Sequence, residues 1–279
     1  MNQPTNEQRA RIERIYERDG ALPEGVDPYD FALEILPFLG STDGPFREQR
    51  ILGLLYALII RRELTNDQIR HLTKTMADEE HLFLDIGSVE GDAVYMRTFC
   101  VFMLSVVVKA HRQRPFLTAD DLQHLKRVTI EYLEQEQDLR GYVSDQTWWA
   151  HGVAHAADVV GELCQCTELV REDLRELLAA GARAVTPDVL VFAHEEDTRM
   201  AQAALHALAR DELSADDVAS WLSTIVPETR WTGRLPSDHF HYVNARNLLR
   251  ALYHEGRTAK LDTDRLVSIL AAHDRLPDR

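Results

Sequence analysis

The chain has 279 residues, and its 45% hydrophobic content is enough for a substantial core in one large domain or two small ones. It carries 31 Lys and Arg residues against 46 Asp and Glu residues, which gives a formal net charge of −15. Such a charge repels phosphate backbones, and the basic residues form no long cluster in the sequence. We therefore expect no nucleic-acid partner.

The apolar segments do not predict export or membrane insertion. The amino-terminal segment is polar and has no apolar stretch typical of a signal peptide. The two most apolar runs, 51–60 and 99–108, have ten residues each, about half of what a membrane span needs. The three cysteines do not have the spacing of a disulfide framework. We expect a cytoplasmic protein with no membrane partner.

Apolar residues recur at helical spacing along almost the whole chain, and no segment shows sustained alternation typical of strands. Three caps support this interpretation, because Thr65, Thr118 and Ser214 each precede a helical pattern that begins with acidic residues. The predicted helices are 5–19, 28–39, 45–62, 65–77, 92–112, 118–139, 147–166, 168–184, 193–210, 214–225, 237–255 and 261–274.

The order of these helices predicts an all-α fold. Helix pairs recur roughly every 40 residues, the length of a HEAT or armadillo unit, although the repeats are not alike in sequence. No linker rich in Gly, Ser or Pro divides the chain, so we expect a single domain over residues 1–279. The expected architecture is an α/α superhelix of stacked antiparallel helix pairs, and an irregular helical bundle is the alternative.

One predicted helix carries an unusual polar stripe. His151, His155, Asp158 and Glu162 have the spacing i, i+4, i+7 and i+11, which places them on one helical face. His151, His155 and Asp158 could bind a divalent metal such as zinc or manganese, because imidazole and carboxylate are suitable ligands. The same residues could line a pocket for a polar ligand, or form the solvated face of an otherwise apolar helix.

Three further polar clusters accompany the stripe. The first contains Glu136, Asp138 and Arg140 and directly precedes the stripe; the carboxylates could complete a metal site or act as a general base. The second surrounds Asp197 and Arg199, which could form an ion pair that orients the stripe or simply complement a helix amino terminus. The third contains Asn244 and Asn247, which we interpret mainly as buried amides that bind backbone groups.

Five segments of the chain carry a family resemblance. They are FLGSTDGPFREQRILGLLYALI (38–59), EQEQDLRGYV (134–143), WAHGVAHAAD (149–158), HEEDTRMA (194–201) and NARNLLRALY (244–253). With these motifs the chain resembles a bacterial family known as domain of unknown function 2785. The resemblance implies an all-helical, HEAT-like fold but no activity, substrate or cofactor. At one position the chain departs from the family, where we would expect Gly and find Trp148.

Two functional hypotheses from different classes follow. The first is a HEAT-like binding or scaffold protein with a polar, acidic pocket on its inner face, which would bind a protein, a peptide or a small polar ligand. The second is a metal-dependent hydrolase or transferase with a His/His/Asp site. The candidate ligand-binding residues are Glu136, Asp138, Arg140, His151, His155, Asp158, Asp197, Arg199, Asn244 and Asn247.

Overall fold

The computed structural model describes residues 3–226 and 232–258. Within these residues it contains eleven α helices that pack as sequential pairs, two short helical turns of other types and one small β hairpin. A mostly helical fold is therefore confirmed. The predicted helix 261–274 lies outside the described residues.

The helical elements follow one another with short connections. The amino-terminal half contains α1 (Asn6–Glu17), α2 (Pro28–Ile35), the 3-10 helix η1 (Leu36–Gly40), the π-helical turn η2 (Phe46–Ile51), α3 (Leu52–Ile60), α4 (Asn66–Met76), α5 (Ala93–Gln113) and α6 (Ala119–Gln135). The carboxyl-terminal half contains β1 (Tyr142–Ser144), β2 (Trp148–Trp149), α7 (Gly152–Cys164), α8 (Arg171–Val185), α9 (Glu196–Leu208), α10 (Ala215–Ile225) and α11 (Ser237–Thr258).

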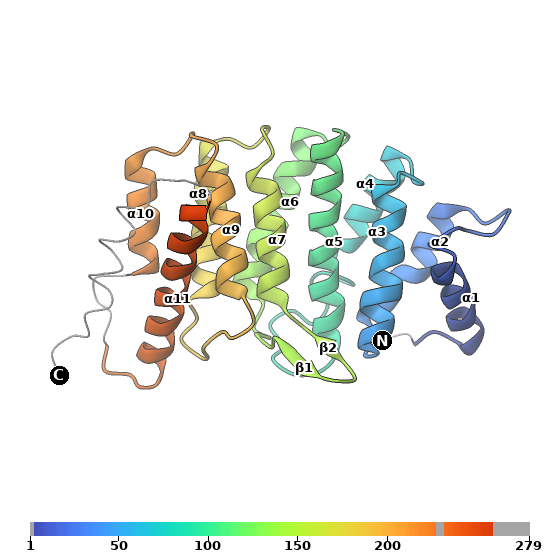
Figure 1. Cartoon of the computed structure of the whole chain (residues 1–279), viewed down its shortest axis with the longest axis horizontal. Helices are drawn as coiled ribbons and strands as arrows, with labels where there is room; N and C mark the ends of the chain where they lie inside the picture. The colour runs from blue at the N-terminus through green and yellow to red at the C-terminus, as the bar shows by residue number, and fades with distance from the viewer. Residues whose placement is uncertain (1–2, 227–231, 259–279) are drawn as a thin grey trace.

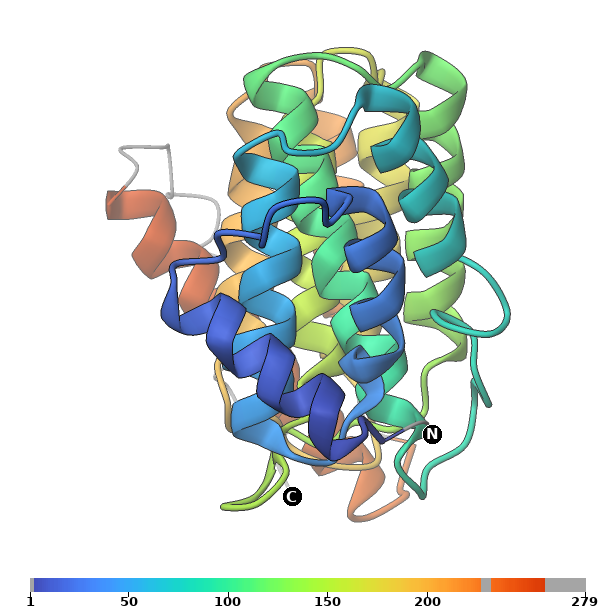
Figure 2. The ribbon, with the colours of Figure 1, turned by 90° about the vertical axis from the view of Figure 1, so that its right-hand side faces the viewer.

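The helices from α3 onward alternate between two layers (Figures 1 and 2). Helices α3, α5, α7, α9 and α11 pack side by side in one layer, which we call the front layer. Helices α4, α6, α8 and α10 form the rear layer, in which α4 packs on α5, α6 on α7, and α8 on both α7 and α9. Helices α1 and α2 cover the amino-terminal end of the stack. Consecutive helices thus form antiparallel pairs.

Local sequence signals explain where the helices begin and how they pack. The three predicted caps are confirmed, because Thr65, Thr118 and Ser214 each form a capping box with the residue three positions later. The apolar faces meet between the layers, where one cluster of buried side chains extends from Ile12 to Leu252. This continuous core fixes the position of every front-layer helix relative to the next.

Among the described helices, α5 alone is long and apolar enough to cross a membrane by length and composition. In the fold, however, 83% of its apolar window is buried, because α5 lies between α3 and α7 and also packs on α4. Its apolar character is that of a central core helix, which is apolar on all sides.

The predicted helix 147–166 is wrong at its start. Residues 142–149 form a two-stranded antiparallel hairpin, and α7 begins only at Gly152. The buried guanidinium of Arg47 accounts for this, because it donates hydrogen bonds to the carbonyls of Thr147 (2.5 Å) and Trp149 (3.0 Å). A long-range contact therefore overrides the helical pattern in this segment.

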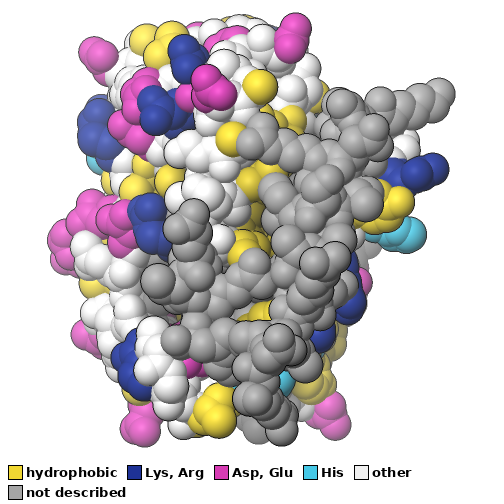
Figure 3. All heavy atoms as spheres, turned by 90° about the vertical axis from the view of Figure 1, so that its left-hand side faces the viewer, with side chains coloured by type: hydrophobic (Ala, Val, Ile, Leu, Met, Phe, Trp, Pro, Cys, Tyr) yellow, Lys and Arg dark blue, Asp and Glu magenta, His cyan; other side chains and the backbone are white. Residues whose placement is uncertain are grey.

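Charged side chains lie scattered on the end of the stack formed by α10 and α11. On the described part that Figure 3 displays, Lys and Arg side chains lie among Asp and Glu side chains and do not gather in one patch. This mixture of positive and negative side chains agrees with the sequence, in which the basic residues form no long cluster.

Candidate functional site

The predicted residues Glu136, Asp138 and Arg140 form a structural clamp and not the wall of the histidine site. Glu136 accepts two hydrogen bonds from Arg97, at 2.7 and 2.8 Å, and the two side chains are each only 1% exposed. Arg97 also donates to the carbonyl of Leu84, while Arg140 pairs with Asp138 and donates to the carbonyl of Gly91. These bonds fasten the loop between α4 and α5 to the end of α6. A role for Glu136 or Asp138 as general base next to the histidines has no support in this arrangement.

The clamp borders a different cavity. Glu136 and Tyr132 line a space of about 440 Å³ between the ends of α6 and α8, which contains none of the stripe histidines. The first predicted cluster and the stripe therefore face different parts of the molecule.

The predicted stripe is divided into two parts. His151 precedes the first helical residue and has a φ of 60°, so it does not continue the helical face of α7. Its Nε2 donates a hydrogen bond to the carbonyl of His194 (2.6 Å), and its ring stacks on Trp149 with 4.8 Å between the ring centroids. The left-handed backbone turns His151 towards the segment before α9.

His155 lies in the first full turn of α7 and is almost completely buried. Its ring is packed edge-on against Phe99 and Phe102 of α5, with centroid distances of 5.1 and 5.0 Å. Its Nδ1 lies 3.1 Å from the carbonyl oxygen of Thr98. Because a carbonyl only accepts, Nδ1 carries the proton and Nε2 carries the lone pair.

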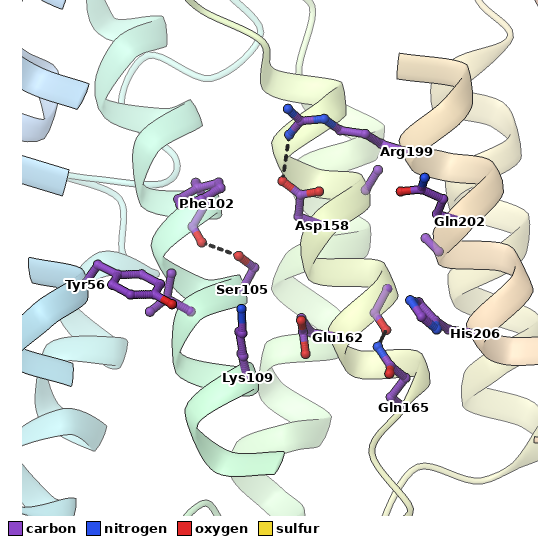
Figure 4. A pocket seen from close by; sticks show the side chains of 14 residues that line it. Tyr56, Phe102, Ser105, Lys109, Asp158, Glu162, Gln165, Arg199, Gln202 and His206 are labelled. Carbon is purple, nitrogen blue, oxygen red and sulfur yellow. Dashed lines mark hydrogen bonds and ion pairs between the residues drawn. The ribbon is translucent and has the colours of Figure 1, made fainter. Parts of the chain in front are cut away.

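The lower part of the stripe faces a groove on the front layer (Figure 4). Asp158 forms an ion pair with Arg199 of α9 at 2.9 Å, and Glu162 forms one with Arg112 of α5. The predicted partner of Arg199 was Asp197, but Asp197 instead accepts a hydrogen bond from the backbone N–H of Thr198. Arg199 therefore contacts the stripe through its ion pair with Asp158.

A cavity of about 530 Å³ is lined by both histidines, and we take it as the candidate site. Three segments that are distant in the sequence meet there: the π-helical turn η2, the start of α7 with the preceding hairpin, and the segment before α9. Turns of the π type are frequent at functional sites, which makes the position of Glu48 on η2 noteworthy. We call this space the histidine cavity. Its lining consists of Glu48, Trp149, His151, His155, Ala193, His194, Glu195 and Arg199.

Buried Arg47 positions the cavity wall. Its guanidinium lies over the rings of Tyr95 and Phe99, at 4.4 and 4.5 Å from their centroids. It donates to Glu48 at 2.9 Å, and the same carboxylate oxygen accepts the backbone N–H of Trp149 at 3.3 Å. Arg47 therefore fixes both Glu48 and the hairpin that carries Trp149.

Burial determines the charge states in the cavity. It lowers the pKa of His151, against the opposing effects of the His194 carbonyl and Glu196, and it lowers the pKa of His155 well below the ordinary value. Burial also raises the pKa of Glu48, which Arg47 opposes. In the groove, burial raises the pKa of Asp158 to about 6 in spite of Arg199. Both histidines are thus neutral at neutral pH.

The cavity offers hydrogen-bond acceptors. His151 and His155 each use one nitrogen as a donor to a carbonyl, which leaves the other nitrogen with a lone pair. None of the hydrogen bonds among the described residues involves these lone-pair nitrogens, and both histidines line the cavity. With the carboxylates of Glu48 and Glu195, they form an acceptor-rich lining.

The arrangement does not fit the predicted His151/His155/Asp158 metal site. Among the described residues, no group of three or more His, Cys, Asp or Glu side chains is placed to hold a metal ion. The reason is that each side chain has a different partner: the His194 carbonyl, the Thr98 carbonyl and the Arg199 guanidinium, respectively. The helical spacing of these three residues in the sequence therefore did not bring their side chains together at one point.

The predicted asparagines lie outside the histidine cavity. Asn244 is buried on α11, accepts the backbone N–H of Phe192 and donates to the carbonyls of Pro187 and Leu190, at 2.8–3.0 Å. It fastens the loop between α8 and α9, as the structural interpretation of buried amides predicts. Asn247 is half-buried on the same helix and does not line the cavity.

Two residues beside the cavity have unusual local requirements. A Cβ at Gly141 would lie 2.2 Å from Nδ1 of His194, so only glycine leaves room for that ring. Trp148 has a φ of 55°, a conformation that glycine adopts easily and other residues rarely. This is the position at which the family resemblance leads us to expect glycine.

Sequence reasoning missed several residues of the site. Glu48, Arg47 and Trp149 were not candidates, although all three lie within the segments that carried the family resemblance. His194 was noticed only as part of a charged helix start. These residues have in common that they lie near the start of α7 in the fold. Their proximity depends on tertiary contacts, which leave no periodic pattern in the sequence.

Comparison with known proteins supports the resemblance. The family model described as "Protein of unknown function (DUF2785)" matches residues 82–254, which include the hairpin, α7 and α9 but not the segment 38–59. No curated protein and no solved structure matches the chain. Since the match covers more than half of its 279 residues, the chain belongs to the DUF2785 family.

Proposed function

We propose that the protein is a binding protein whose histidine cavity takes a small organic cation with N–H donors, such as an ammonium or guanidinium group. The observation that carries this proposal is the acceptor-rich lining, in which two neutral histidines present lone pairs beside carboxylates. A cation that donates hydrogen bonds complements such a lining, whereas an anion would leave the acceptors unpaired.

The balance of charge around the cavity supports a cationic ligand. The carboxylates are those of Glu48, Glu195 and the buried Glu196. Arg47 compensates Glu48, and the guanidinium of Arg199 is engaged by Asp158. Trp149, which stacks on His151 at the cavity wall, adds an aromatic surface that attracts cations.

We further propose that the stack is a HEAT-like superhelix and a single domain, with the histidine cavity on the face formed by the front layer. The alternation of helices between two layers supports this architecture. The cytoplasmic location also remains our proposal, and the three free, buried cysteines support it.

A set of three compounds with the same four-carbon skeleton tests the cavity: putrescine is dicationic, 1,4-butanediol neutral and succinate anionic. We expect titration calorimetry to detect binding of putrescine, weaker binding of butanediol and none of succinate. Glu195→Gln should weaken putrescine binding by about threefold to fivefold, the effect of one partly exposed charge. Glu172→Gln on the rear layer is the matched control and should change nothing.

Two results would overturn the proposal. One is tighter binding of succinate than of putrescine. The other is that putrescine does not bind, or binds Glu195→Gln as tightly as the unmodified protein.

A further inference from the structure

The groove on the front layer lies next to the histidine cavity. It has a volume of about 260 Å³ and lies between α5, α7 and α9, with Tyr56 of α3 at its edge (Figure 4). Small residues of α7 and α9, among them Ala157, Gly161 and Ala203, line its floor. Arg199 lines both spaces, so they adjoin one another on the front layer, and we call the two together the path.

The two ends of this path carry opposite charge. The histidine cavity contains an excess of carboxylates, whereas the far end of the groove contains Lys109, and the nearby Glu162 is paired with Arg112 of α5. Lys109 is exposed and forms no ion pair with any residue that the structure describes. Figure 4 shows it at the same end of the groove as Glu162, away from Arg199. That end is therefore suited to an anionic group.

Between the ends, the walls present uncharged polar side chains. Ser105 donates its hydroxyl hydrogen to the carbonyl of Phe102 and keeps its lone pairs. Gln202 uses its amide nitrogen to bind Glu255, which leaves its amide oxygen as an acceptor. Oxygen acceptors along a groove suit the N–H groups of an extended peptide backbone.

The length of the path sets the spacing of the charges. From Gly152, where α7 begins, to Glu162 the chain advances ten residues, or about 15 Å along the helix. An extended peptide spans that distance with about five residues.

We propose that the bound cation is the basic side chain of an extended peptide segment, which lies along the groove and places an acidic side chain, about five residues away, at Lys109. This inference rests on the proposed function, because the histidine cavity must accept a cation in the first place. It adds the partner class, a protein segment with one basic and one acidic residue at this spacing.

The experiment uses the full chain and the synthetic peptide acetyl-Arg-Gly-Ser-Gly-Ser-Glu-amide. Three comparison peptides replace Glu by Gln, shorten the spacer by two residues, or consist of acetyl-Arg-amide alone. We expect calorimetry to show about fivefold tighter binding of the full peptide than of the Gln peptide, the upper range for an exposed ion pair. The short-spacer peptide should lose this advantage.

Two protein variants test whether Lys109 in the groove causes the tighter binding of the Glu peptide. Lys109→Met retains the apolar stem and should remove the difference between the Glu and Gln peptides, while Lys74→Met on the rear layer should preserve it. Equal binding of the Glu and Gln peptides to the unmodified protein, or a preserved difference in Lys109→Met, would overturn the inference. If putrescine still binds and Glu195→Gln weakens that binding, the proposed cation site remains supported. Failure of the peptide inference is therefore distinguishable from failure of the proposed function.

Discussion

The clamp around Glu136 and the histidine cavity are both dense polar regions, and they differ in what their polar atoms bind. In the clamp, Arg97, Glu136, Asp138 and Arg140 bind one another and backbone carbonyls. In the cavity, each of two histidines binds one carbonyl with one ring nitrogen and lines the cavity with a lone pair on the other. A satisfied network stabilises the fold, whereas accessible acceptors in a cavity can bind a ligand. The comparison distinguishes polar residues that stabilise the fold from those that we propose bind a ligand.

The largest expected effect comes from breaking the clamp. Arg97→Met leaves the carboxylate of Glu136 buried without its cation, so we expect the free energy of unfolding to fall by about 3–5 kcal/mol. Urea denaturation measures this loss. The matched control is Arg183→Met, whose ion pair with Glu134 is exposed, at 57% and 53%, and should contribute less than about 1 kcal/mol. Equal losses in the two variants would contradict a structural role for the clamp.

The next largest effect is expected at Gly141, which follows Arg140 of the clamp in the sequence and lies against His194 of the cavity. Gly141→Ala places a Cβ against the ring of His194, so we expect a loss of about 1–3 kcal/mol in stability together with weaker putrescine binding. Gly53→Ala is the control, because its Cβ would find its nearest neighbour at 3.9 Å and helix propensity favours alanine. Unchanged stability and binding in Gly141→Ala would show that the His194 ring is not fixed there.

The fold class could be predicted from the sequence because helical periodicity and caps act locally. Thr65, Thr118 and Ser214 cap their helices through residues only three positions away. The start of α7 could not be predicted in this way, because Arg47, about 100 residues earlier, binds the hairpin carbonyls. Helical spacing predicted the stripe, but the partners of its residues come from α5, from α9 and from the segment before α9. Tertiary contacts therefore decided which polar residues share a cavity.

A smaller effect depends on pH and concerns His155. Its folded pKa lies well below the unfolded value of about 6.5, so the unfolded chain takes up a proton that the folded chain does not. The stability that this difference contributes is present above pH 6.5 and is lost as the pH falls through that value. His155→Gln can still donate to the Thr98 carbonyl but does not titrate.

We therefore expect the free energy of unfolding of the unmodified protein to fall, relative to His155→Gln, by up to about 2 kcal/mol between pH 6.5 and pH 5. Urea denaturation at the two pH values gives the difference. Asp158, with its raised pKa, has the opposite pH dependence, but it is present in both proteins and cancels. A difference that does not change with pH would show that His155 takes up a proton in the fold as readily as in the unfolded chain.

The smallest expected effect tests whether the accessible lone pairs of the cavity bind metal. Zinc added at one equivalent should leave the melting temperature unchanged, because His151, His155 and Asp158 bind three separate groups and do not converge. Metal content after dialysis, measured by mass spectrometry, should be the same in the unmodified protein and in His151→Ala. One equivalent of zinc that His151→Ala loses would instead mean that the cavity rearranges around a metal. The acceptor-rich lining would then be an incomplete ligand set, and the metal-dependent hydrolase or transferase would become the better hypothesis.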